Sequence, residues 1–132
     1  MQMKRSALAV VVAAMAVAEL AAAGIGGTWA FAFRAEWAPP ELACTFTLNE
    51  SALGGTCGSR GRRVEIVDAK SDGTSLQWTV RVPTGRSGSI VAYTFSGTLD
   101  AQSDTISGTL TETDVSGAMP PRETAFTARR EQ

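Results

Sequence analysis

The chain has 132 residues, a formal net charge of −1 and no histidine. This length favours a single domain. The charge excludes the strongly basic character of nucleic-acid-binding domains. The absence of histidine excludes Ser-His-Asp and Cys-His catalytic arrangements and every His-containing metal site.

The N-terminus has the three parts of a secretory signal peptide. Lys4 and Arg5 precede the apolar run Ala7–Ala18, and the small residues Ala21–Ala23 follow it. We therefore predict a helical signal peptide over residues 1–23 and a mature domain over residues 24–132, in a periplasmic or secreted protein. The alternative is an uncleaved anchor, but the run is short for a membrane span and Glu19 closes it. After cleavage 10 basic and 12 acidic residues remain, with no membrane span.

The rest of the chain alternates between apolar and polar residues with a period of two, which is typical of strands that are wet on one side. We expect eight strands: Thr28–Trp37, Leu42–Leu48, Leu53–Gly58, Arg63–Asp68, Ser75–Val82, Ile90–Leu99, Thr105–Glu112 and Glu123–Arg129. Short connections favour antiparallel neighbours, which could form a sandwich or a closed barrel. Closure removes exposed strand edges, so the predicted fold is an all-β, eight-stranded antiparallel up-and-down barrel.

The two cysteines test the register of the second and third strands. A hairpin over residues 49–52 pairs residues whose numbers sum to 101, so that Cys44 faces Cys57 and Phe46 faces Gly55. In an oxidising compartment such a pair predicts a cross-strand disulfide, with Cα atoms about 4.5 Å apart for a non-hydrogen-bonded pair.

The sequence SGTL occurs at residues 96–99 and again at residues 107–110. A hairpin between these segments pairs residues that sum to 205 and places Gly97 opposite Gly108, both facing inward. Inward glycines leave space in a narrow interior. Two interpretations stay open for that space: room for a bulky tryptophan, or room for a ligand.

The opening Gly27-Thr28-Trp29, together with the arginines that end the last strand, resembles the calycin superfamily of lipocalins, fatty-acid-binding proteins and avidins. The layout is most similar to small exported lipocalin-like barrels of bacteria. The resemblance implies that Trp29 packs across the closed end against Arg129 or Arg130, and we take Arg129 as its structural partner. The biotin-contacting residues of avidins have no counterpart here. Periplasmic inhibitors of bacterial metalloproteases are similar in size, export, opening motif and disulfide content, although their cysteines are more widely spaced.

An up-and-down order places alternate connections at the same end of the barrel. The connections after the first, third, fifth and seventh strands contain all the prolines of the mature chain and most of its loop arginines. We predict that they surround an open mouth. The candidate ligand contacts there and in the interior are Phe33, Trp37, Trp78, Tyr93, Arg62, Arg86 and Arg122. The structural alternative is that the aromatic rings fill the barrel and the arginines are only solvated.

The predicted function is binding of a small hydrophobic or amphipathic ligand, anionic amphiphiles included, inside the barrel. An enzyme is the least supported class because no nucleophile is paired with a base. No cofactor, metal or nucleic acid is expected. A protein partner is the alternative, as for a protease inhibitor that acts through a flexible tail at Gly24–Gly27 or through the loop over residues 114–122.

Overall fold

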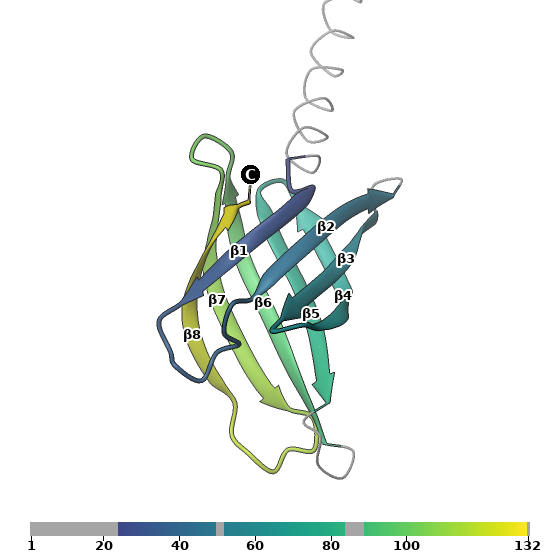
Figure 1. Ribbon diagram of the computed structural model, residues 1–132, viewed down its shortest axis with the longest axis vertical. Coiled ribbons are helices and arrows are strands. Elements are labelled where there is room, and N and C mark those ends of the chain that lie inside the picture. Colours follow the sequence, from purple (N-terminus) through teal and green to yellow (C-terminus); the bar gives the residue numbers. More distant parts are fainter. Residues whose placement is uncertain (1–23, 50–51, 84–88, 132) are drawn as a thin grey trace, which may run out of the picture.

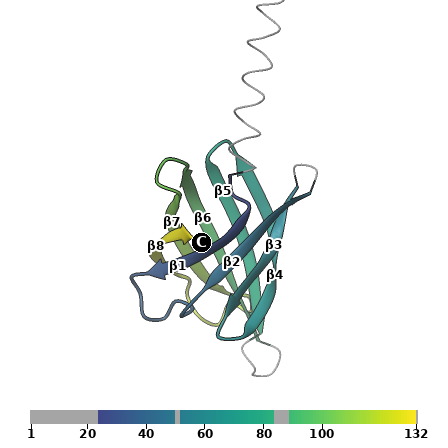
Figure 2. The same cartoon turned by 45° about the horizontal axis from the view of Figure 1, so that its top comes forward.

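The computed structural model describes residues 24–49, 52–83 and 89–131. Eight antiparallel strands form a closed barrel in which each strand pairs with its neighbours in sequence and the last pairs with the first (Figures 1 and 2). The strands are β1 (Gly27–Phe33), β2 (Ala43–Asn49), β3 (Ala52–Ser59), β4 (Arg62–Asp72), β5 (Ser75–Pro83), β6 (Ile90–Asp100), β7 (Thr105–Asp114) and β8 (Arg122–Arg130). The predicted all-β antiparallel barrel is confirmed, and the sandwich alternative is wrong.

Three of the sequence predictions fall outside the described residues: the signal peptide over residues 1–23, the tight turn at residues 50–51 and the position of Arg86. Within the described ranges, no helix has the length and apolar character needed to span a membrane.

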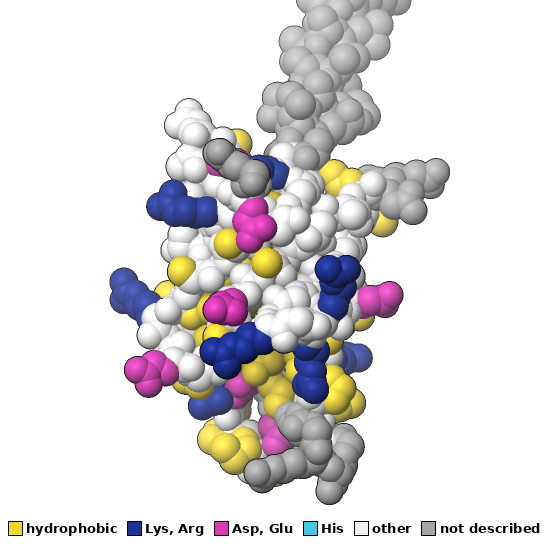
Figure 3. Space-filling view, in the orientation of Figure 1, with side chains coloured by type: hydrophobic (Ala, Val, Ile, Leu, Met, Phe, Trp, Pro, Cys, Tyr) yellow, Lys and Arg dark blue, Asp and Glu magenta, His cyan; other side chains and the backbone are white. Residues whose placement is uncertain are grey.

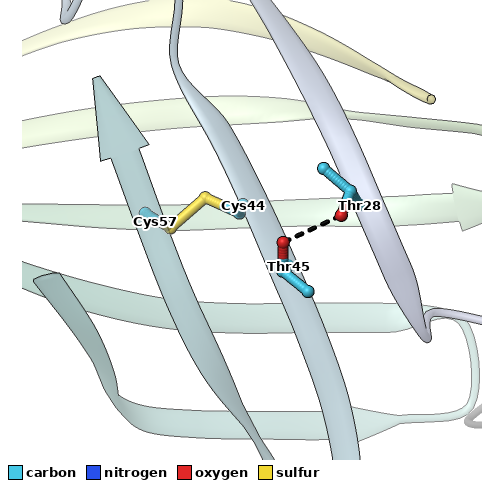
Figure 4. The surroundings of a disulfide bond; sticks show 4 residues. All are labelled: Thr28, Cys44, Thr45 and Cys57. Atoms are coloured by element: carbon cyan, nitrogen blue, oxygen red, sulfur yellow. Dashed lines mark hydrogen bonds between the residues drawn. A yellow bond between two sulfur atoms is a disulfide. The ribbon is translucent and has the colours of Figure 1, made fainter. Parts of the chain in front are cut away.

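Both predicted hairpin registers are confirmed. Cys44 pairs with Cys57 across β2 and β3, and Gly97 pairs with Gly108 across β6 and β7. The two cysteines form a disulfide with their Cα atoms 4.0 Å apart (Figure 4). Closing a loop of this length stabilises a fold by roughly 3 kcal/mol in the chain-entropy model. The bond indicates an oxidising, non-cytoplasmic environment.

The first strand is shorter than predicted. It ends at Phe33, whereas the alternating pattern predicted a strand as far as Trp37. Beyond Phe33 the backbone N–H of Ala35 donates to the side-chain oxygen of Thr124 (3.1 Å) rather than to the backbone of β8. The N–H of Ala38 then donates to the carbonyl of Ala35 (3.3 Å), which closes a turn. Trp37 therefore lies in the loop between β1 and β2.

The fourth strand is longer than predicted. A bulge interrupts its period of two, so the alternating pattern did not indicate its second half. Val67 pairs with Thr79 and Lys70 pairs with Gln77, so two residues oppose Trp78. The extra residue shifts the inward face from even to odd positions, and Ala69 packs against the core. A strict period of two cannot follow a strand through a bulge.

The two inward glycines lie where the backbones of β6 and β7 come close together, so that a side chain would not fit. A Cβ atom on Gly108 would lie 1.9 Å from the carbonyl oxygen of Ser96, and one on Gly97 would lie 3.1 Å from the ring of Phe126. Beside Gly97 the neighbouring aromatic ring is that of Phe126 and not of a tryptophan, and beside Gly108 the partner backbone occupies the space.

Trp29 closes one end of the barrel, which we call the floor. Its ring is fully buried, and its Nε1 donates to the carbonyl of Ile25 (2.8 Å), whose side chain is also fully buried. The guanidinium of Arg130 lies 4.4 Å from the centre of the Trp29 ring. The choice of Arg129 was wrong: it pairs with Ala30, whose side chain is exposed, whereas Arg130 pairs with Trp29.

The segment before β1 is part of the floor. Arg130 donates through Nη1 to the carbonyl of Gly26 and through Nη2 to the carbonyl of Gly24. The expectation of a flexible tail at Gly24–Gly27 was wrong, because these hydrogen bonds and the buried Ile25 hold the segment against the barrel.

The opposite end, which we call the mouth, carries the β1–β2, β3–β4 and β7–β8 connections (Figure 1). The β4–β5 and β6–β7 turns lie at the floor. In the face shown in Figure 3, Lys and Arg side chains gather in the half nearer to the mouth, mixed with acidic and hydrophobic side chains.

Candidate functional site

A layer of aromatic rings fills the middle of the barrel. Its members have ring centroids 4.9–6.2 Å from at least one neighbour and are Phe31, Phe46, Trp78, Phe95 and Phe126. Trp78 stacks on Phe95 at 4.9 Å and is fully buried. The layer lies between the floor and the mouth, and its member Phe95 also lines the cavity on the mouth side.

The mouth contains a cavity of about 270 Å³, which we call the inner cavity. Most of its wall is apolar, and its polar groups are few. The lining residues are Trp37, Pro39, Pro40, Leu42, Cys57, Gly58, Ser59, Arg62, Val64, Val80, Val82, Tyr93 and Phe95. An apolar cavity with a few placed polar groups is the usual form of a small-molecule site.

One wall of the inner cavity is the β1–β2 loop, residues 34–42. Leu42 is buried, and its carbonyl accepts a hydrogen bond from the N–H of Phe31 (3.0 Å). The hydroxyl of Ser59, in β3, donates to the carbonyl of Pro40 in the same loop. The two consecutive prolines have no N–H to donate, which explains why this segment leaves the sheet and crosses the mouth as a loop.

Arg62 is the charged residue in the wall of the inner cavity. It belongs to the inward series of β4 with Val64 and Ile66, whereas Arg63 follows the outward series. Its Nη1 donates to the carbonyl of Pro83 (3.0 Å). In the described part of the chain, no carboxylate lies within ion-pairing distance of Arg62. The positive charge at this wall is therefore not neutralised by an ion pair with a described residue.

A second, wider cavity of about 560 Å³ lies beside the first, and we call it the outer cavity. Its lining residues are Trp37, Ser89, Val91, Tyr93, Glu112, Asp114, Met119, Pro120, Pro121 and Arg122. Trp37 and Tyr93 line both cavities and are thus the boundary between them.

Arg122 holds Trp37 at this boundary. Its guanidinium lies 4.3 Å from the centre of the Trp37 ring, and its Nε donates to Oε1 of Glu112 at 2.6 Å. The pKa of Arg122 is raised, chiefly by the hydrogen bond to Glu112. A guanidinium fixed over an indole face gains cation–π energy of roughly 0.5–2 kcal/mol.

The hydroxyl of Tyr93 completes this cluster. Burial, with the nearby negative charge of Glu112, raises the pKa of Tyr93 to about 12. Tyr93, Glu112 and Arg122 come from adjacent strands, and Tyr93 pairs with Glu112 while Glu112 pairs with Arg122. The ion pair and the cation–π contact therefore connect β7 and β8 to the β1–β2 loop through Trp37.

Tyr93 is the only tyrosine of the chain, so its ionisation can be observed alone. We expect the tyrosinate absorbance of the native protein to appear with a midpoint near 12, compared with about 10.0 after denaturation. Since the folded pKa is the higher one, the stabilisation by neutral Tyr93 is complete below pH 10.0 and is lost as the pH rises through about 12. The Glu112→Gln variant should titrate at lower pH, and an unchanged midpoint would show that Glu112 has no part in the shift.

The structure brings some of the expected site residues together and separates others. Trp37 and Tyr93 meet at the mouth, Arg62 lines the inner cavity and Arg122 lines the outer one. Phe33 and Trp78 line neither mouth cavity. Phe33 is half-buried beside Phe31, and Trp78 belongs to the aromatic layer.

The remaining parts of the site have weaker signals in the sequence. Pro39, Pro40 and Leu42 line the inner cavity although the pattern assigned them only to a connection and a strand start. Two prolines followed at the second position by the apolar Leu42 are the signal that could have marked this loop as a wall. Among the described residues, no three Cys, Asp or Glu side chains gather closely enough to hold a metal ion.

Comparisons with models of known protein families, with curated proteins and with solved structures found no match to this chain. The closed eight-stranded antiparallel barrel is consistent with a lipocalin-like fold. Barrels of this kind resemble those of non-enzymatic binding proteins.

Proposed function

We propose that the protein binds a small hydrophobic or amphipathic ligand in the inner cavity, with an anionic group of the ligand at Arg62. The observation that carries this proposal is the apolar cavity of about 270 Å³ with Arg62 in its wall. Apolar walls favour burial of the body of the ligand. The unneutralised guanidinium favours a carboxylate or a similar anion at one end.

The volume limits the size of the ligand. An engineered cavity of about 150 Å³ binds benzene, so a cavity of about 270 Å³ suits a ligand of roughly ten to twelve non-hydrogen atoms. Decanoate has this size and carries one carboxylate. The protein that we propose is a periplasmic or secreted carrier of such molecules, of the calycin type, and it performs no chemistry on them.

A protein-binding role has one observation in its favour. Val115 and Met119 in the β7–β8 loop are 58% and 66% exposed. Exposed apolar side chains on a projecting loop are typical of contacts with another protein. This alternative predicts that the loop, and not the inner cavity, carries the activity.

Replacing Arg62 separates the two roles. We expect Arg62→Ala to weaken decanoate binding about tenfold, because a charged hydrogen bond of about 1.5–3 kcal/mol is lost at a partly exposed wall. The affinity should also lose its dependence on salt. Isothermal titration calorimetry at low and high salt measures both the loss of affinity and the loss of salt dependence. Decanol serves as the uncharged comparison ligand.

Arg63→Ala is the matched control, since it removes the same charge from the neighbouring outward position. It should leave decanoate affinity within about twofold of the wild-type value, as expected for a solvent-screened charge on the outer face of the barrel. Equal losses in the two variants would mean that only the general charge of the mouth matters, and the assignment of Arg62 would be wrong.

A further inference from the structure

Trp37 and Tyr93 stand between two cavities that would otherwise be continuous. We infer that Trp37 is a specificity residue that limits the length of the ligand to what the inner cavity holds. This inference rests on the proposed function, and it names the class of ligand more closely: anionic amphiphiles with a short chain.

The first step of the argument is that Trp37 has a defined position. The indole is covered by the guanidinium of Arg122 at 4.3 Å. Glu112 fixes that guanidinium through the 2.6 Å ion pair and lies opposite Tyr93 on the neighbouring strand. A side chain held by such a network acts as a wall rather than as a freely rotating group.

The second step is that the loop carrying Trp37 is anchored on both sides of the ring. The N–H of Ala35 bonds to Thr124 before it, and the carbonyl of Pro40 accepts the hydroxyl of Ser59 after it. Ala38, next to Trp37, is buried. Moving the loop that carries the indole therefore requires breaking contacts with β3 and β8.

The third step concerns what lies beyond the boundary. The outer cavity has apolar walls at Val91, Met119 and Pro120, so it could accommodate an extended chain. It also contains the carboxylates of Glu112 and Asp114, which disfavour an anionic end. A ligand with its anion at Arg62 would thus enter the outer cavity only with the far end of its chain.

The test is the affinity of saturated fatty acids from hexanoate to hexadecanoate for the wild type and for Trp37→Ala. For the wild type we expect affinity to rise about fourfold with each added methylene up to about decanoate and then to stay level or fall. For Trp37→Ala we expect the rise to continue beyond decanoate, so that tetradecanoate binds at least tenfold more tightly than it binds to the wild type. Binding is measured below the micelle-forming concentration of each acid.

A second variant keeps the indole of Trp37 and removes the guanidinium of Arg122 that covers it. Arg122→Met should shift the limit in the same direction as Trp37→Ala but by a smaller amount, because the ring stays and only its fixation is lost. Arg63→Ala, which changes charge at an outward position, should keep the wild-type limit. If the chain-length limit shifted more in Arg63→Ala than in Arg122→Met, Arg122 would not be the residue that holds Trp37 in place.

The outcomes distinguish this inference from the proposed function. If wild-type decanoate binding depends on Arg62 but Trp37→Ala has the same length limit, Trp37 is not the specificity residue and the proposed function stands. If no fatty acid binds to the wild type or to either variant, the proposed function is wrong and the inference falls with it.

Discussion

An alanine in place of Gly55 is expected to destabilise the barrel by at least about 3 kcal/mol, since overpacking and a strained backbone act together. A Cβ atom at this position would lie 1.9 Å from the carbonyl oxygen of Thr45, which belongs to the backbone of the neighbouring strand. The residue also has φ of +139°, a conformation that residues with a side chain rarely adopt. Neither problem can be relieved by rotating a side chain.

The neighbouring glycine supplies the control. A Cβ atom on Gly54 would meet no heavy atom within 4 Å. Gly54→Ala should therefore change stability by no more than about 1 kcal/mol, in either direction. Urea denaturation of both variants, with the disulfide intact, measures the difference. A loss for Gly55→Ala no larger than that for Gly54→Ala would show that β2 and β3 can separate at this point without cost.

The same pair of strands shows why so much of the fold could be predicted. Once one pair of residues in an antiparallel hairpin is known, every other pair has the same sum. Cys44 and Cys57 therefore determined the whole β2–β3 register, including the approach of Gly55 to Phe46. A register slip by one residue would turn every apolar side chain outward, so burial specifies the pairing strongly.

Prediction failed where the backbone departs from this regularity. The bulge between Val67 and Lys70 and the end of β1 at Phe33 are two departures that alternation does not encode. At the end of β1 the decisive contact is the side chain of Thr124, a buried hydroxyl on β8, a distant part of the sequence. Such a contact between remote positions is visible only in three dimensions.

For the candidate site, the useful signal was whether a residue lies at an inward or an outward position in the alternation of a strand. Tyr93 lies at an inward position of a predicted strand and lines the inner cavity. Arg62 was predicted to lie in the connection before the fourth strand, and it lines the same cavity as the first residue of β4. Trp78 lies at an inward position too, but its depth along the barrel places it in the aromatic layer. The alternation gives the face of a residue, whereas its depth depends on the tilt and stagger of the strands.

The same alternation of inward and outward positions identifies the arginine at the floor, at the end of β8. Phe126 and Ala128 point inward, and continuing in steps of two leads to Arg130 rather than to Arg129. Ile25 carried a weaker signal, a single apolar residue between glycines. Its complete burial reflects the space that a barrel must fill at its closed end.

Arg130→Met is the second change with a large expected effect. The guanidinium makes hydrogen bonds to the carbonyls of Gly24 and Gly26, an ion pair with Asp104 at 2.9 Å and a contact with the Trp29 ring. Methionine keeps much of the apolar stem but leaves the two partly buried carbonyls without this donor. Hydrogen bonds to a charged group contribute about 1.5–3 kcal/mol each and are not additive, so we expect a total loss of about 3 kcal/mol.

Arg129→Met is the matched control because it removes the same charge one position away, from a side chain that is exposed. We expect it to change the free energy of unfolding by no more than about 0.5 kcal/mol, as is usual for surface substitutions. Hydrogen exchange adds a local measurement: in Arg130→Met the indole N–H of Trp29, which donates to Ile25, should exchange faster than in the wild type. If Arg129→Met proved the more damaging of the two, the floor would be held by the outward arginine after all. An equal, small loss in both would instead mean that Ile25 and Trp29 close the barrel by packing alone, without the guanidinium.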